Sequence, residues 1–211
     1  MYNGEHWENI YSSKPSNLLS WFQEQASLSL RLVIEHAGSK SCAIIDAGGG
    51  ASTFADGLVK EGFRNLTVAD ISPSALEMSK ARLGEDAKGI RWITGSILDI
   101  ELPEKAFDIW HDRAVFHFLA SEEEREAYAG KALRSLRTGG ILIVAAFAED
   151  GPEKCSGLNV TRYSPGILTA ALGGRFTLLG HEDDFHLTPS GALQHFIYCT
   201  FKAGGTEPGS H

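Results

Sequence analysis

The sequence has few cysteines and no long apolar run, and each shortage excludes a class of protein. Its three cysteines are odd in number and widely spaced, which argues for reduced thiols rather than a disulfide framework. No apolar run approaches the roughly 18 residues that a membrane helix needs. The polar start of the chain, 1–14, lacks the apolar centre of a secretory signal. We therefore expect a cytoplasmic protein without a membrane partner.

Basic residues are also scarce: 19 Lys and Arg stand against 27 Asp and Glu, for a net charge of −8. Because binding to phosphates requires a basic surface, we expect no nucleic-acid partner. The 211 residues contain no internal repeat or linker-like stretch and suit one domain over 1–203, followed by a tail over 204–211. Nothing marks a dimer surface, so a monomer is expected.

Between Cys42 and Phe147 short apolar runs alternate with helical patterns. The predicted strands are Ala43–Ala47, Leu66–Asp70, Ile90–Thr94, Phe107–His111 and Ile141–Phe147. Helices are predicted over 52–61, after the Ser72 cap, and from the capping box of Ser121 and Glu124. This alternation indicates a parallel sheet covered on both faces.

The two ends of the chain differ from this middle part. Phe176–Leu187 and Leu193–Phe201 read as long strands joined by a turn at 188–191. Two amphipathic segments, 16–25 and 28–37, are expected to form a short N-terminal helical cap over 1–40. The predicted fold is therefore α/β and doubly wound, with a seven-stranded, mostly parallel sheet that ends in an antiparallel hairpin.

A glycine-rich turn follows the first strand. Three consecutive glycines end at Gly50, where the backbone must turn sharply and let a ligand approach without a Cβ in the way. The second strand ends in Asp70, whose carboxylate can accept hydrogen bonds from both hydroxyls of a ribose. The next residue, Ile71, can pack on an adenine. The alternative is that the glycines serve only a tight turn and that Asp70 only caps a helix.

The dinucleotide fingerprint G-x-G-x-x-G fails here, because Thr53 occupies the place of its third glycine. Asp46 instead precedes Gly48 by two residues, in the pattern D-x-G-x-G-x-S. An acidic residue at this loop can hold the α-amino group of S-adenosylmethionine, whose positive sulfonium also suits an acidic site.

Four stretches, taken in order, resemble successive motifs of the class I, Rossmann-like methyltransferases that depend on S-adenosylmethionine. They are Asp46–Ser52, Asp70, Phe107–Ile109 and Leu136–Gly140. The resemblance covers about residues 40 to 150 and implies a Rossmann-like core over 41–203. It implies that Gly48 and Gly50 line the methionine moiety, that Asp70 holds the ribose, and that Ser96 and Ile97 contact the adenine.

The segments His6–Tyr11 and Leu19–Gln23 are similar to the N-terminal cap of thiopurine methyltransferase-like proteins and of small methyltransferase-like lysine methyltransferases. The resemblance implies that this cap closes over the cofactor. The aromatic residues it would bring to the cofactor are Trp7, Tyr11 and Trp21, and Phe22 would contact the substrate. The alternative is that these aromatic residues only attach the cap to the sheet.

The triplet Asp112-Arg113-Ala114 resembles the Asp-Arg-Ala/Gly pattern of thiopurine methyltransferase-like enzymes, whereas related lysine methyltransferases tend to have Asp-Lys-Gly. The Asn/Asp-Pro-Pro-Tyr/Phe tetrapeptide of amine methyltransferases is absent. The triplet favours a small-molecule acceptor, and the missing tetrapeptide argues against methylation of exocyclic amino groups on bases or glutamine. Sulfur or another soft heteroatom is the expected methylated centre, because such an acceptor needs little assistance from a base. A protein lysine methyltransferase is the second interpretation, and a nicotinamide oxidoreductase and a catalytically silent binding module are less favoured.

The catalytic candidates are His111, Asp112 and Arg113, which follow the fourth strand at the carboxyl edge of the sheet. His111 is the candidate base or cofactor contact, and Asp112 could orient it. Three further residues are expected to contact the substrate, namely His117, Cys155 and Arg162. Each of these side chains could instead serve packing alone. No His or Cys spacing indicates a ligand set, so no metal is predicted.

Overall fold

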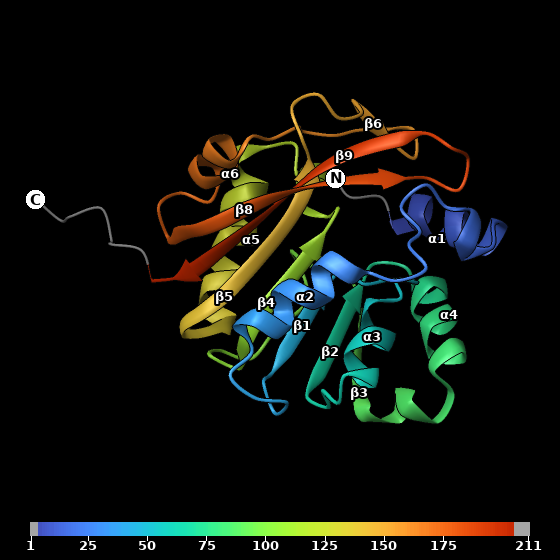
Figure 1. Cartoon of the computed structure of the whole chain (residues 1–211), viewed down its shortest axis with the longest axis horizontal. Helices are drawn as coiled ribbons and strands as arrows, with labels where there is room; N and C mark the ends of the chain where they lie inside the picture. Colours follow the sequence, from blue (N-terminus) through green and yellow to red (C-terminus); the bar gives the residue numbers. More distant parts are fainter. Residues whose placement is uncertain (1–3, 205–211) are drawn as a thin grey trace, which may run out of the picture.

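The computed structural model describes residues 4–204, and it places a twisted sheet between two layers of helices (Figure 1). The strands are β1 (Ile44–Ala47), β2 (Leu66–Asp70), β3 (Ile90–Thr94), β4 (Phe107–Arg113), β5 (Leu136–Phe147), β8 (Phe176–Leu187) and β9 (Leu193–Ala203), with β6 (Lys154–Cys155) and β7 (Leu158–Asn159) in a separate pair. The helices are α1 (Gly4–Ser13), α2 (Ser27–His36), α3 (Phe54–Lys60), α4 (Pro73–Leu83), α5 (Glu122–Ser135) and α6 (Pro165–Ala171). Short 3-10 turns cover Ser16–Leu18, Gly84–Gly89 and Phe116–Phe118.

The main sheet has seven strands in the order β3-β2-β1-β4-β5-β9-β8. The pairs from β3 through β5 are parallel, whereas β9 runs antiparallel to both of its neighbours. The predicted fold class is confirmed. Because β1, β2 and β4 run in the same direction, their carboxyl ends meet at one edge of the sheet, where ligands bind in open α/β folds.

Both faces of the sheet are buried, and neighbouring residues of one strand pack against the helices on opposite faces. Ile44 packs with residues of α2 and α3, whereas Ile45 packs with residues of α5 and α6. Both isoleucines are almost completely buried. A strand covered on both sides reads as a continuous apolar run, which is why β1 was recognisable from sequence. No helix among residues 4–204 is long and apolar enough to cross a membrane.

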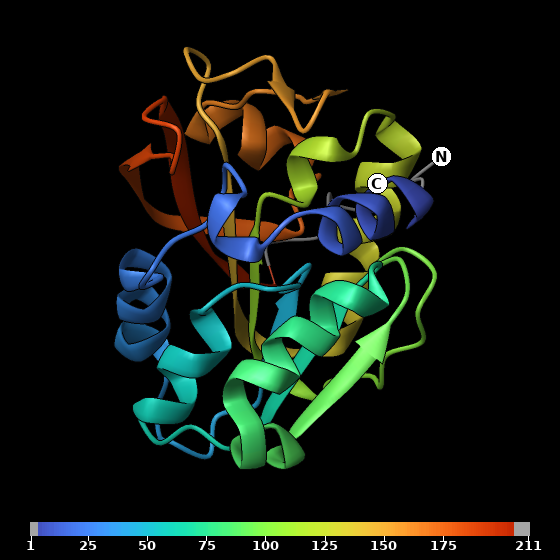
Figure 2. The ribbon, with the colours of Figure 1, turned by 90° about the vertical axis from the view of Figure 1, so that its right-hand side faces the viewer.

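The N-terminal segment differs from the prediction. The expected helix over 28–37 is present as α2, but it packs beside α3 in one of the helical layers. The helix expected over 16–25 is wrong, since only Ser16–Leu18 forms a turn and the chain then crosses the sheet edge as an irregular strap. The cap is instead made by this strap and by α1, which was not predicted as a helix and lies over the carboxyl edge (Figure 2).

The predicted caps are confirmed. The Ser72 hydroxyl accepts a hydrogen bond from the Ala75 N–H at the start of α4. Ser121 and Glu124 form the expected reciprocal capping box at the start of α5. The tail expected at the end of the chain lies, except for Gly204, outside the described residues.

Candidate functional site

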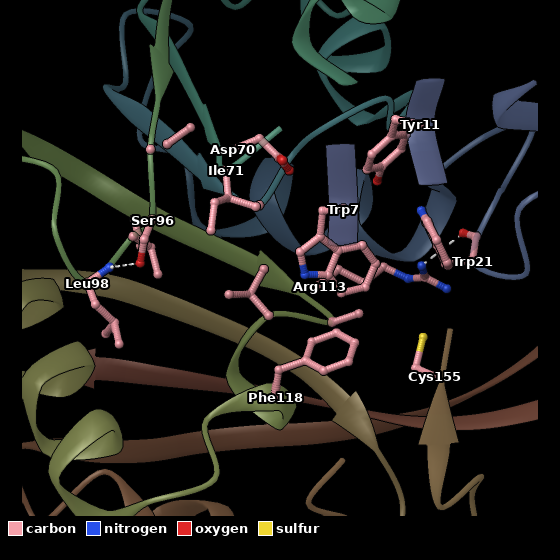
Figure 3. Close-up of a pocket in the computed structure, with 16 residues that line it drawn as sticks. Trp7, Tyr11, Trp21, Asp70, Ile71, Ser96, Leu98, Arg113, Phe118 and Cys155 are labelled. Carbon is pink, nitrogen blue, oxygen red and sulfur yellow. Dashed lines mark hydrogen bonds between the residues drawn. The ribbon is translucent and has the colours of Figure 1, made fainter. Parts of the chain in front are cut away.

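A pocket lies at the carboxyl edge of the sheet, and Trp7 and Tyr11 of α1 form part of its wall (Figure 3). The predicted site residues that line it are Trp7, Tyr11, Trp21, Gly48, Asp70, Ile71, Ser96, Ile97, Arg113 and Cys155. Further lining residues that were not predicted are Ala69, Gly95, Leu98, Ala114, Val115 and Phe118. We refer to this cavity as the main pocket.

Asp70 ends β2 at one side of the main pocket, next to Ile71 (Figure 3). Its Oδ1 accepts a hydrogen bond of 2.8 Å from the Ser72 N–H. Burial raises the pKa of Asp70 to about 7, and the negative charge of Asp46 acts in the same direction. A carboxylate that is so poorly solvated gains strongly from hydroxyl donors on a ligand.

The glycine-rich turn brings the backbone close to this carboxylate. Gly48 and Gly50 have φ angles of +73° and +42°, a region that side-chain-bearing residues rarely adopt. A Cβ on Gly48 would overlap the Val115 side chain, and one on Gly50 would lie 2.8 Å from Asp70 Oδ2. Glycine is therefore required at both positions by conformation and by space.

Aromatic side chains form the wall of the main pocket on the side of the cap (Figure 3). The Trp7 ring makes edge-to-face contacts with Trp21 and Phe118, at centroid distances of 5.7 and 5.1 Å. Tyr11 contacts Trp21 in the same geometry at 6.0 Å. Burial raises the pKa of Tyr11, so its hydroxyl stays protonated. The wall can enclose an apolar ligand group and exclude water from it.

A second pocket adjoins the main one and shares Tyr11, Trp21, Gly48 and Arg113 with it. It is also lined by Asp46, His111 and Phe22. The Asp46 Oδ1 accepts a hydrogen bond of 2.8 Å from His111 Nδ1, whereas its Oδ2 is buried without a partner. A buried carboxylate oxygen without a donor is a fitting site for a ligand ammonium.

A buried chain of hydrogen bonds connects the two ends of this second pocket. Arg113 Nε donates to the Tyr198 hydroxyl at 2.9 Å, which lies 3.3 Å from the Ser29 hydroxyl. The Ser29 hydroxyl lies 2.9 Å from His111 Nε2. Because the Asp46 carboxylate can only accept and Arg113 can only donate, a single direction of donation from Arg113 to Asp46 gives each hydrogen bond of the chain one donor and one acceptor.

The comparisons with known proteins fit this geometry. Residues 45–144 match the family model described as a methyltransferase domain. A solved structure reported with the conversion of a disulfide bond into a thioacetal group during echinomycin biosynthesis superimposes with a TM-score of 0.74, at 19% identity, over 97% of this chain and 94% of that one. The N-methyltransferase NodS from Bradyrhizobium japonicum WM9, crystallised with S-adenosyl-L-homocysteine, gives 0.73 at 17% identity, over 96% and 99% of the two chains.

Residues 45–144 therefore match a methyltransferase domain, and the chain as a whole has the fold of solved class I methyltransferases. Its sequence is also similar to human EEF1A lysine methyltransferase 2, at 24% identity over 156 residues. That match covers 67% of this chain and 66% of the human protein, which is less than two thirds of the human protein's length.

Four of the predicted site residues line neither pocket, namely Gly50, Asp112, His117 and Arg162. Asp112 is fully buried and accepts hydrogen bonds from the Tyr128 hydroxyl and from the Val115 and Phe116 N–H groups, so it shapes the turn after β4. Burial raises the pKa of Asp112 to about 6. His117 is also fully buried, and burial lowers its pKa to about 3. Arg162 pairs with Glu153 on the loop after β5.

Cys155 does line the main pocket, and burial raises the pKa of its thiol to about 11. Local signals could have identified Gly95, which follows β3, but not Phe118, which reads as core. Ser29 and Tyr198 had no local signal, since they reach His111 and Arg113 from sequence positions more than 80 residues away. Among the described residues, no cluster of three or more His, Cys, Asp or Glu side chains could hold a metal ion.

Proposed function

We propose that this protein is a methyltransferase that depends on S-adenosylmethionine and transfers a methyl group to a small-molecule acceptor, at sulfur or another soft heteroatom. The observation that supports it most strongly is that, among residues 4–204, no side chain lining the main pocket is available as a base. Its titratable lining residues are Tyr11, Asp70, Arg113 and Cys155. The raised pKa values keep Tyr11 and Cys155 protonated at neutral pH, and Arg113 is always charged. Asp70 remains, and it is the residue assigned to the cofactor.

An acceptor that must lose a proton during transfer, such as a hydroxyl or an ammonium, needs a positioned base. A thiol ionises partly in water at neutral pH and is intrinsically nucleophilic, so it requires only alignment. His111, the predicted base, is 2% exposed and both of its ring nitrogens are occupied by Asp46 and Ser29. These contacts favour a role for His111 in orienting Asp46.

Several features of the two pockets fit the cofactor. The unpartnered Oδ2 of Asp46 would hold the α-ammonium group, and Gly48, which lines both pockets, would lie beside the methionine moiety. Asp70 would accept the ribose hydroxyls, and Ile71 and Ile97 would pack on the adenine. When bound, S-adenosylmethionine supplies a methyl group activated by its sulfonium. The residues of this chain bind and orient that group, and they keep water away from it.

A protein lysine methyltransferase is the second candidate, because the relatives named EEF1A lysine methyltransferase 2 from human, mouse and zebrafish are 24, 25 and 27% identical to this chain. A lysine ammonium in the main pocket would lie beside the like charge of Arg113 and without a base. The thioacetal chemistry named for the structural neighbour above concerns sulfur and favours the first candidate. Membership of the thiopurine methyltransferase-like group stays a prediction.

The test is to incubate the protein with methyl-labelled S-adenosylmethionine and an extract of the source cells, and to separate volatile, small-molecule and macromolecular fractions. We expect the label in the volatile or small-molecule fractions. Asp70→Ala, which should not bind the cofactor, is the control for enzyme-independent labelling. Label found only on protein, and abolished by prior blocking of lysine, would instead establish the second candidate.

A further inference from the structure

Lys131 lies on α5, outside both pockets, and connects that helix to the loop 95–100, which follows β3. Its Nζ donates hydrogen bonds of 2.7 Å to the Leu98 carbonyl and 2.6 Å to the Ile100 carbonyl. Hydrogen bonds from a charged donor are stronger than those between neutral groups. One side chain of α5 therefore holds two points of a loop that lies more than 30 residues earlier in the sequence.

The loop 95–100 forms one wall of the main pocket. Three of its residues line that pocket directly after Gly95, namely Ser96, Ile97 and Leu98. The Ser96 hydroxyl accepts a hydrogen bond of 3.2 Å from the Leu98 N–H (Figure 3). The Ser96 carbonyl accepts two more, from the N–H groups of Asp99 and Ile100. These contacts shape the loop locally, whereas the two hydrogen bonds from Lys131 fix its position relative to α5.

The polar side chains of the main pocket are distributed unevenly. Among residues 4–204, its only carboxylate is that of Asp70, which the proposed function assigns to the ribose. Arg113 and Cys155 lie at the opposite side of the pocket from Ser96 (Figure 3). The adenine, which would pack on Ile97, is therefore left with the Ser96 hydroxyl and the backbone of the loop as its polar partners. Recognition by backbone groups depends on where the loop lies.

We propose, on the basis of the S-adenosylmethionine-dependent function above, that Lys131 is a positioning residue that holds this loop in place for the adenine of the cofactor. A loop that is ordered before binding loses less entropy when it binds a ligand. The two hydrogen bonds are only partly buried, so water can replace the ammonium group at both carbonyls when the lysine is removed. Loss of Lys131 should therefore weaken binding of the adenine without unfolding the protein.

The experiment measures binding by calorimetry, with S-adenosylhomocysteine and S-inosylhomocysteine as probes. The two compounds differ only in the base, in which an oxygen replaces the amino group of adenine. The wild type is expected to bind the adenine compound at least about tenfold more tightly, because groups of the loop lose their partners on the other base. Lys131→Met should weaken S-adenosylhomocysteine about 3- to 10-fold and reduce the preference for adenine by a similar factor. Lys131→Arg, which can also donate to both carbonyls, should restore most of each. Lys88→Met, which removes an exposed lysine paired with Glu85, should change neither.

Hydrogen exchange separates positioning from folding. In ligand-free Lys131→Met, the amides of Asp99 and Ile100 should exchange faster than in the wild type, whereas the amides of β1 should not change. Equal weakening of both compounds, or a preference for adenine that Lys131→Met retains in full, would overturn the proposal. If the wild type and Lys131→Met bind S-adenosylhomocysteine equally well, only this inference is removed. A wild type that binds neither compound would remove the proposed function together with it.

Discussion

At the scale of the residue, Asp70 shows how folding changes the chemistry of a side chain. An isolated aspartate titrates near 3.9, whereas burial at the end of β2 raises the pKa of Asp70 to about 7. The Ser72 N–H satisfies one of its oxygens. A ligand that donates hydrogen bonds to this group binds the ionised form, so ligand affinity depends on the pH in a range where free aspartate would be fully charged.

We expect the dissociation constant of S-adenosylhomocysteine to rise as the pH falls below about 7, by up to about tenfold per pH unit, because the protonated carboxyl cannot accept both ribose hydroxyls. Calorimetry between pH 5.5 and 8.5 measures this effect. Asp70→Asn should bind weakly and with little pH dependence. A wild-type affinity that stays constant from pH 6 to 8 would contradict the assignment of Asp70 to the ribose.

At the scale of the element, α1 is attached to the start of α4 by one carboxylate. Glu8 accepts hydrogen bonds from the Ser72 hydroxyl at 2.7 Å, from the Ser74 N–H at 3.2 Å and from the Ser74 hydroxyl. These hydrogen bonds lower the pKa of Glu8. A negative charge at a helix N-terminus is favourable, and here it also holds the helix that carries Trp7 and Tyr11 over the main pocket.

We predict that Glu8→Ala weakens S-adenosylhomocysteine binding about 3- to 10-fold, because the aromatic wall is then ordered only at the moment of binding. Hydrogen exchange of the amides in α1 should become faster, whereas exchange in the sheet should not change. Glu126→Ala, on the exposed face of α5, is the matched control. Unchanged affinity and unchanged exchange in α1 would show that Glu8 does not hold the cap.

At the scale of the whole molecule, the polar chain from Asp46 to Arg113 joins parts that are distant in sequence. Ser29 comes from α2, His111 from β4 and Tyr198 from the reversed strand β9. All three side chains are at most 2% exposed. Buried polar groups that satisfy one another fix the relative placement of their elements, because separating any pair leaves an unsatisfied group.

Ser29→Ala is expected to lower the free energy of unfolding by about 1–3 kcal/mol, since His111 Nε2 and the Tyr198 hydroxyl then lose a buried partner. Urea denaturation measures this change. Ser27→Ala removes an exposed hydroxyl from the same helix and should change the stability by less than about 0.5 kcal/mol. Equal effects of the two substitutions would refute the structural role of the chain.

The alternation of apolar and helical patterns was sufficient to predict the sheet. Strands β2, β3 and β8 have the predicted bounds, and the caps at Ser72 and Ser121 are where the sequence indicates them. The exception is 16–25, where apolar residues at helical spacing instead form a strap. Its side chains attach to the site: Trp21 packs against Trp7, and its carbonyl binds Arg113. Tertiary contacts override a weak local preference there.

The sequence by itself determined the helices and strands and the ends of the strands that face the ligand. The spacing of apolar residues, the glycines of a tight turn and the caps of a helix are all local properties of the chain. It indicated Asp70 and Gly48, both of which line the main pocket, for that reason. Only the tertiary structure decided which neighbours of His111 face the pockets. Asp112 and His117 are buried in the core, whereas Arg113 lines the pocket wall. The direction of a side chain after a strand depends on contacts with distant elements, which no local pattern encodes.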